Sequence, residues 1–160
     1  MSELSLRRAE ADDAERVFNW ANDPATRAAS FSSAVIPWSD HAPWFATSID
    51  RPDRHLFIAM MLTDGVPTPV ALVRLQVDPN NSTHAEVGVN VAPEARGRGV
   101  GRKALVALAD AARTLGLQQL LASIRPTNPA SVRAFKAVGY NAIADAEIGG
   151  QPALRFTLDL

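Results

Sequence analysis

The chain has 160 residues, of which 47% are hydrophobic and 21% are charged, and its formal net charge at pH 7 is −1. This length fits one domain, residues 1–160, and the near-neutral charge excludes a general attraction to nucleic acid or to an anionic membrane. The N-terminus has no apolar signal segment, no apolar run approaches about 20 residues, and cysteine is absent. We therefore expect a cytoplasmic protein with no membrane partner, no metal site and no cysteine-linked intermediate.

The first third of the chain predicts a short strand followed by a helix. Residues 4–8 read LSLRR and form the strand, after which Asp12 is expected to cap the helix with Glu15 as its capping-box partner. Trp20 lies about 100° from the apolar stripe on a helical wheel, so we expect it to flank the core. Pro24 disfavours helical geometry before it and should end the helix. The residues of the apolar stripe are Ala14, Val17, Phe18 and Ala21.

The middle of the chain predicts a loop and helix followed by three strands. Residues 30–50 are aromatic, polar and irregular, as pocket-forming segments often are, with a helix from about Ser39. Residues 55–62 and 70–78 are predicted strands joined by a turn. Residues 83–93 alternate with a period of two, which predicts a strand with one apolar face and one polar face. The apolar face carries Ala85, Val87, Val89 and Val91, and the polar face carries His84, Glu86, Gly88 and Asn90.

The C-terminal half predicts helix, strand, helix and strand. The first helix covers residues 101–115 and stops at Gly116, and strand 118–126 is followed by helix 131–138 and strand 152–160. The inner face of the first helix is expected to carry Leu105, Leu108, Ala112 and Leu115. This element order describes one α/β mixed sheet with helices packed on it.

A glycine-rich segment joins the strand at 83–93 to the following helix. It reads APEARGRGVGRKAL from Ala92 to Leu105, and its spacing fits neither the dinucleotide fingerprint nor the P-loop. The pattern R-x-x-G-x-G, Arg96 to Gly101, lets consecutive main-chain N–H groups converge on an anion at the helix start. Four cations crowd the positive end of that helix dipole, where only a bound anion makes them favourable. The segment therefore predicts a site for a phosphorylated ligand.

The stretch VNVAPEARGRGVGRKAL, followed by a strand and NPASVRAFKAVGY, resembles the acetyl-CoA-binding core of the GCN5-related N-acetyltransferase (GNAT) family. The resemblance implies a central, mostly antiparallel sheet with two splayed strands and about four helices. It also implies acetyl-CoA as co-substrate, with the pyrophosphate on the R-x-x-G-x-G main chain and pantetheine along the preceding strand. The implied coenzyme contacts are Val89, Val91, Arg96, Gly97, Arg98, Gly99, Val100, Gly101, Arg102, Asn128, Ser131 and Phe135.

Acetyl transfer to an amine needs a base, a stabilised oxyanion and a proton for the leaving thiolate. Glu86 matches a position where the family often places an acidic residue, so we predict it as the base, with His84 as the second candidate; either could instead be a polar residue of a sheet face. Many family members have tyrosine where this chain has Phe135, which cannot donate a proton. Ser131 or water remains for that role, and Asn128 could equally be a helix cap. Main-chain N–H groups beside Val91 could bind the oxyanion.

The acceptor is predicted from the segment between residues 19 and 45. That segment resembles a subgroup that acetylates nucleotide-linked amino sugars such as UDP-4-amino sugars, but the pattern also occurs in relatives that modify ribosomal-protein N-termini or aminoglycosides. The predicted contacts are Trp20, Asn22, Arg27, His41 and Trp44, with Arg27 placed for a phosphate. The two tryptophans could instead be core residues. We expect a small-molecule amine acceptor and a monomer or homodimer, and a non-catalytic acyl-CoA-binding module is the alternative.

Overall fold

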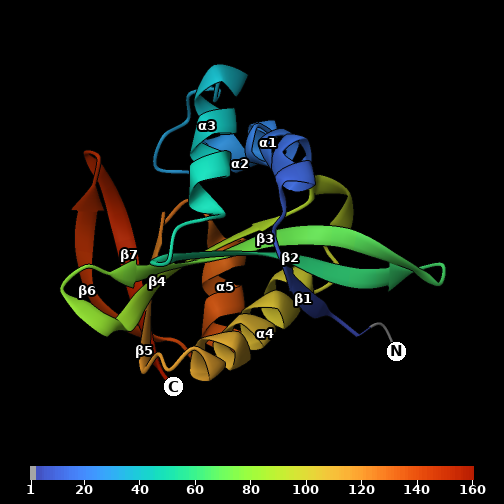
Figure 1. The fold of residues 1–160 in the computed structure, drawn as a ribbon. Helices are drawn as coiled ribbons and strands as arrows, with labels where there is room; N and C mark the ends of the chain where they lie inside the picture. The colour runs from blue at the N-terminus through green and yellow to red at the C-terminus, as the bar shows by residue number, and fades with distance from the viewer. Residues whose placement is uncertain (1–2) are drawn as a thin grey trace.

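The computed structural model describes residues 3–160, which form one mixed sheet of seven strands with helices on both faces (Figure 1). The strands lie side by side in the order β1-β2-β3-β4-β5-β7-β6. Within the described residues only β4 and β5 run parallel, and the other neighbouring pairs are antiparallel. The bounds are β1 Ser5–Arg8, β2 Arg54–Thr63, β3 Val66–Asp78, β4 Asn81–Val91, β5 Gln119–Ile124, β6 Asn141–Ile148 and β7 Gln151–Asp159. The predicted fold class is confirmed.

The helices divide between the two faces of the sheet (Figure 1). One face carries α1 Ala14–Ala21, α2 Pro24–Ala29 and α3 Trp38–Ser48, and the other carries α4 Val100–Thr114 and α5 Pro129–Val138. Short 3-10 turns precede α1 and α4, at Ala11–Asp13 and Pro93–Ala95. None of the described helices is long and apolar enough to cross a membrane.

The sequence missed α2, a helix of six residues that begins where the preceding helix was expected to stop. Pro24 occupies the first turn of α2, where a missing N–H costs nothing, and the Asp23 carboxylate accepts a hydrogen bond from Thr26 N at 3.2 Å. α2 contains no buried residue, so no apolar stripe marks it. The expectation that α1 ends before Pro24 is correct, but the chain turns directly into a second helix.

The sequence also missed β6, which forms a hairpin with β7. Six of its eight residues are exposed, so the strand has no apolar face that would produce a period of two. The hairpin turns at Gly149 and Gly150, whose φ values of +56° and +78° favour glycine. Pairing with β7, and not burial, holds this edge strand in place.

The entry into α1 is organised by Asp13, and the expected capping box of Asp12 and Glu15 is wrong. The Asp13 carboxylate is buried and accepts from Glu10 N at 2.8 Å, from both terminal nitrogens of Arg7 at 2.8 and 2.9 Å, and from Arg16 at 2.6 Å. Burial acts to raise the pKa of Asp13, but the hydrogen bonds from Arg7 and Glu10 N and the two arginine charges outweigh it and lower the pKa. Asp13 thus joins β1 to α1 as a carboxylate.

Three predicted core assignments need correction. Trp20 was expected to flank the core, but it is 5% exposed and is buried with Val17, because the buried face of α1 is rotated from the predicted stripe. Phe18 is only half-buried and meets the Trp38 ring edge-on at 5.2 Å, so it faces α3. Leu115 is 39% exposed because α4 ends at Thr114 and the chain then turns at Gly116, whose φ is +82°.

The remaining predicted face of α4 holds the helix against the sheet. Leu105, Leu108 and Ala112 are fully buried, and α4 contacts β1, β3 and β4. Gly101, in the first turn of α4, lies next to Val91 at the end of β4, where a Cβ would be 3.7 Å from the valine Cγ2. Core packing therefore places the N-terminus of α4 beside the last residues of β4.

Candidate active site

The strands β4 and β5 separate partway along their length, as the resemblance implied. Their parallel pairing covers three positions and ends with Glu86 opposite Leu121, although β4 continues to Val91 and β5 to Ile124. A gap therefore opens in the middle of the sheet, beginning immediately after Glu86. An extended ligand can enter such a gap and hydrogen-bond the exposed strand edges.

The main chain of β4 provides hydrogen-bonding groups in this gap. Gln118 N donates to Thr83 O at 2.7 Å, so Thr83 and every second residue after it turn their main-chain groups toward β5. Val89 and Val91 belong to this set and lie beyond the last pair with β5. Ala92, in the alternate set, donates to Val70 O on β3 at 2.8 Å. The amides of Val89 and Val91 are consequently directed into the gap.

The glycine segment forms the turn between β4 and α4 that its spacing predicts. Gly97 and Gly99 have φ values of +77° and +72°, in the left-handed region where other residues are strained. Gly99 is the N-cap of α4, and its carbonyl accepts from Lys103 N, so the N–H groups of Val100, Gly101 and Arg102 are the unsatisfied donors of the first turn. These donors, together with the helix dipole, form an anion-binding end.

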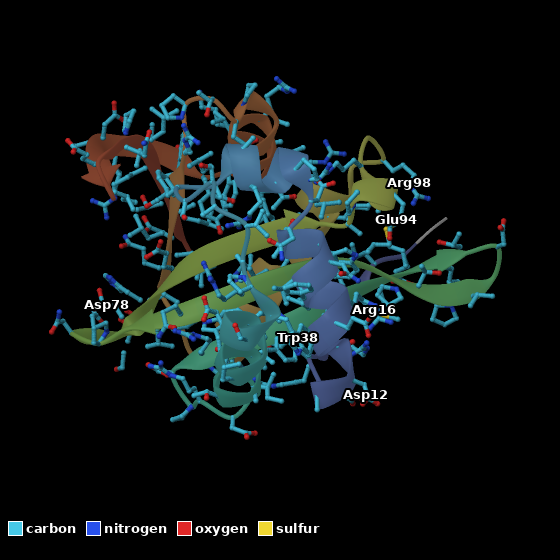
Figure 2. The ribbon with its side chains drawn as sticks, turned by 90° about the horizontal axis from the view of Figure 1, so that it is seen from above. Asp12, Arg16, Trp38, Asp78, Glu94 and Arg98 are labelled. Carbon is cyan, nitrogen blue, oxygen red and sulfur yellow. The ribbon has the colours of Figure 1, made fainter. Side chains whose placement is uncertain are left out.

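The arginines of this segment lie at its exposed surface. Figure 2 shows Arg98 beside Glu94 at one end of the sheet, with Asp78 at the opposite end. Arg98 donates to the main-chain oxygen of Glu94 at 3.3 Å, and Arg102 is exposed without a hydrogen bond or ion pair to any of residues 3–160. Their charges remain available to a ligand.

Arg96 connects the glycine segment to α2 on the other side of the site. Its guanidinium donates to the Asp23 carboxylate at 2.7 Å and to the Thr26 hydroxyl at 2.8 Å. The hydrogen bond from Arg96 is the largest influence on the pKa of Asp23 and lowers it. Burial acts in the opposite direction, but the α2 amides lower the pKa further and the net change is downward. Sequence spacing did not predict this contact, because 73 residues separate the partners.

Glu86 and His84 lie on the face of β4 that is opposite α4. Ala85 and Val87 are buried on the α4 side, whereas Glu86 is exposed and His84 is half-buried. Glu86 is therefore an accessible carboxylate at the point where β4 and β5 separate. His84 lies further from the gap, opposite Gln119 on β5.

The residues predicted on α5 have different environments. Asn128 caps the helix, because its side-chain oxygen accepts from Ser131 N at 3.3 Å. Ser131 is half-buried in the first turn. Phe135 is 3% exposed, and its ring packs edge-on against the Tyr140 ring with 4.9 Å between the ring centroids. The ring therefore belongs to the core, and we do not assign it to the coenzyme. Tyr140 is the single tyrosine of the chain; burial raises the pKa of its hydroxyl, which has no partner among residues 3–160.

Three predicted acceptor contacts form internal hydrogen bonds. The Asn22 side chain bonds Ile36 N and O at 2.8 and 2.9 Å. Arg27 donates to the main-chain oxygens of Ala21 and Ser32 at 2.7 and 3.0 Å, and burial lowers its pKa. His41 is buried, its Nε2 lies 2.8 Å from Ala14 O, and burial lowers its pKa below the ordinary value. Asn22 and Arg27 hold the loop between α2 and α3, and His41 joins α3 to α1, so all three side chains have partners within the protein.

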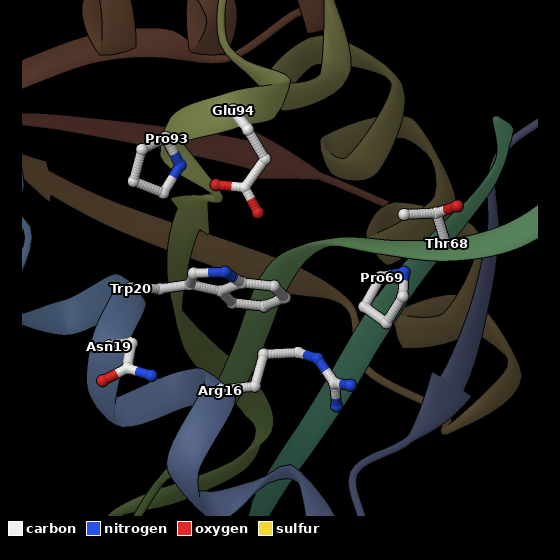
Figure 3. Close-up of a pocket in the computed structure, with 7 residues that line it drawn as sticks. All are labelled: Arg16, Asn19, Trp20, Thr68, Pro69, Pro93 and Glu94. Atoms are coloured by element: carbon white, nitrogen blue, oxygen red, sulfur yellow. The ribbon is translucent and has the colours of Figure 1, made fainter.

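The two predicted tryptophans line different surfaces. Trp20 borders a shallow pocket of about 470 Å³, in which the Glu94 carboxylate points toward the indole ring (Figure 3). The other lining residues are Arg16, Asn19, Thr68, Pro69 and Pro93, so this pocket excludes Glu86 and the β4–β5 gap. Trp44 is 36% exposed on α3, and the Arg54 guanidinium lies over its ring at 5.9 Å.

The comparisons with known proteins agree with this geometry. The model of the acetyltransferase (GNAT) domain family matches residues 3–141. A spermidine N-acetyltransferase from Vibrio cholerae, solved with CoA and spermine, superposes with a TM-score of 0.86 at 20% identity, over 98% of this chain and 95% of that one. An aminoglycoside acetyltransferase solved with coenzyme A and kanamycin gives 0.81 at 14% identity, over 98% and 95%. A domain from Methanocaldococcus jannaschii gives 0.86 at 17%, over the full length of both chains.

The chain therefore belongs to the GNAT acetyltransferase family. It is an acetyl-CoA-dependent N-acetyltransferase. Among curated proteins, no sequence shows a significant match to this chain. At these levels of identity the solved structures establish the fold, and the acceptor is a separate question.

Proposed function

We propose that the enzyme acetylates the primary amine of a small acceptor by direct attack on acetyl-CoA in a ternary complex, with Glu86 as the general base. The observation that carries this proposal is the position of Glu86. It belongs to the last residue pair before β4 and β5 separate, and its carboxylate is exposed on the face opposite α4. A carboxylate at this point can reach an amine that approaches from that face, directly or through one water.

The reaction on this geometry has three steps. Glu86 removes a proton from the acceptor ammonium, and the amine lone pair then attacks the carbonyl carbon of the acetyl thioester. The main-chain N–H groups of Val89 and Val91 are placed to hold the developing oxyanion. The C–S bond then breaks, the attacking nitrogen loses its second proton to water to give the amide, and the coenzyme leaves as a thiolate that takes a proton from solvent, directly or through the Ser131 hydroxyl. The α5 position at which many family members have tyrosine is Phe135 in this chain, and it lies in the core, so no tyrosine of α5 serves as the acid.

For the acceptor we propose an amine that carries an anionic group, of which a nucleotide-linked amino sugar is the leading candidate. The side chains of Asn22, Arg27 and His41, which the sequence predicts as acceptor contacts, form internal hydrogen bonds. The support for an anionic acceptor therefore comes from the sheet. On the sheet face beneath α1 to α3, Arg74 lies opposite Gly88, two residues from Glu86, and Arg54 lies further across the sheet beyond Gln76. This positive charge suits an anion better than a polycation. Aminoglycosides, polyamines and N-terminal peptides are the competing acceptors.

An acceptor screen tests the proposal. Candidate amines are incubated with acetyl-CoA and the protein, and mass spectrometry detects the addition of one acetyl group. On the best acceptor, Glu86→Gln should lower kcat by about a hundredfold or more while acetyl-CoA binding stays unchanged. Glu15→Gln, at an exposed position of α1, is the matched control and should keep full activity.

Two outcomes would overturn parts of the proposal. Full activity of Glu86→Gln would remove Glu86 as the base and direct attention to His84. Tight coenzyme A binding without acetylation of any amine would instead support the non-catalytic module.

A further inference from the structure

Arg74 lies on the same sheet face as Glu86. It is on β3 directly opposite Gly88 of β4, and Gln76 on β3 is opposite Glu86. The Arg74 guanidinium lies flat on Gly88, because a Cβ built on this glycine would be 3.0 Å from one terminal nitrogen and 3.3 Å from the guanidinium carbon. Glycine at residue 88 thus makes room for the guanidinium at the floor of the sheet, close to the β4–β5 gap.

The charge of Arg74 is not neutralised by a direct ion pair within residues 3–160. The side chain is half-buried, yet it makes no hydrogen bond and no ion pair with any described residue. Arg54 on β2 is close enough that its pKa is lowered, first by burial and then by the charges of Arg51 and Arg74. Asp53, which lies near Arg54, is held by Arg51 at 2.7 and 2.8 Å, and Glu86, two residues from Gly88 on the same face, forms no ion pair with Arg74.

Arg74 has the like charge of Arg54 nearby and Glu86 two residues along the neighbouring strand, so an anion in direct contact with its free guanidinium would stabilise it further. The glycine segment that receives the coenzyme phosphates lies at the end of β4, eight residues beyond Gly88, so Arg74 serves a different ligand. Glu86 is two residues from Gly88 on the same face, a distance of about 7 Å along the strand. A small molecule bound by Arg74 can therefore reach the carboxylate of the base, Glu86.

We propose that Arg74 binds an oxyanion, a phosphate or carboxylate, of the acceptor, and thereby places the acceptor amine at Glu86. This inference rests on the proposed function and adds the residue that binds the anionic group of the acceptor and the distance of that group from the reacting nitrogen. It predicts that the enzyme prefers amines with an anionic group about 7 Å from the reacting nitrogen. Spermidine and kanamycin, which are polycations, should be poor acceptors.

Direct binding tests the proposal without catalysis. Inorganic pyrophosphate is titrated by calorimetry into protein saturated with coenzyme A, so that the glycine segment is already occupied; succinate replaces pyrophosphate in the carboxylate arm. Arg74→Gln should weaken binding by about tenfold, as expected for the loss of a charge-assisted hydrogen bond. Gly88→Ala, which displaces the guanidinium without removing it, should weaken binding to a smaller extent. Arg113→Gln, an exposed arginine of α4, is the control and should bind as the wild type does.

A kinetic measurement separates recognition of the acceptor's anionic group by Arg74 from an effect of Arg74 on the charge of Glu86. The ratio of kcat/KM for glucosamine 6-phosphate to that for glucosamine should fall about tenfold in Arg74→Gln. Unchanged pyrophosphate and succinate binding in Arg74→Gln would overturn the inference. So would an unchanged ratio with a shifted pH profile of kcat, because Arg74 would then act only on the charge of Glu86. Either result leaves the Glu86→Gln test of the proposed function standing.

Discussion

The glycine segment between β4 and α4 and the segment from Asn22 to His41 are both rich in polar residues, but the two regions use them differently. In the glycine segment the main chain provides the binding groups, and Arg98 and Arg102 stay at the surface. In the acceptor-side segment the side chains of Asn22, Arg27 and His41 bind main-chain atoms of the protein itself. Similar polar residues thus stay exposed at the predicted ligand site in one region and bind the protein's own main chain in the other.

The difference shows which kind of site a sequence pattern can identify. A site built from main-chain N–H groups depends on glycine spacing and on a strand-to-helix junction, and both are visible along the chain. A site built from side chains depends on where each side chain points after folding. The loop of residues 30–37 has little regular structure, so its main-chain groups need partners, and the nearby polar side chains supply them.

Of the substitutions that test this comparison of the two regions, the largest effect is expected at the glycine segment. Gly99→Ala places a side chain at a φ of +72°, which costs about 1–2 kcal/mol and distorts the start of α4. The KM for acetyl-CoA should rise about tenfold, measured by steady-state kinetics. Gly116→Ala is the matched control at the other end of α4, with a φ of +82° and, as at Gly99, no atom within 4 Å of the new Cβ.

The control should lose similar stability and keep the wild-type KM. If both variants shift the KM equally, the effect is one of stability, and the glycine segment does not hold the coenzyme.

A smaller effect is expected at Arg27, and it concerns stability. Its guanidinium donates in three directions, to Ala21 O, Ser32 O and the Ser30 hydroxyl. Arg27→Lys and Arg27→Gln should each lower the free energy of unfolding by about 1–2 kcal/mol, because a single ammonium cannot reach all three oxygens. Urea unfolding measures this loss, and the acceptor KM should change little in either variant.

Full stability of the lysine variant, with a raised acceptor KM in the glutamine variant alone, would contradict the structural role. That pattern would return Arg27 to phosphate binding.

The smallest effect is expected at the ion pair that joins the two regions. Asp23→Asn keeps a good N-cap for α2 but removes the carboxylate that binds Arg96. The charge of Arg96 would then act on the coenzyme alone, so the KM for acetyl-CoA should fall about two- to fivefold at low salt. The difference from wild type should shrink as ionic strength rises. A raised KM would mean that Asp23 positions Arg96 for the coenzyme.

Elements with an apolar period were predictable, and elements without one were not. The alternation of β4 and the stripe of α4 follow directly from residue order, and both are where the sequence placed them. The helix α2 buries no residue and β6 is mostly exposed, so neither carries a periodic signal. Trp20 was misplaced because the orientation of α1 depends on β1, α3 and Asp13, which a helical wheel does not include.

By itself the sequence determined the class of fold and predicted where the donor site lies, because both depend on local patterns: hydrophobic period, helix termini and glycine spacing. It also placed Glu86 on the polar face of its strand. Only the tertiary structure decided that β4 and β5 separate immediately after Glu86 and that Phe135 lies in the core. It also decided that Arg74 lies on Gly88 without an ion pair to any of residues 3–160. These features depend on pairing and packing between segments that are distant along the chain, where residue order carries no direct signal.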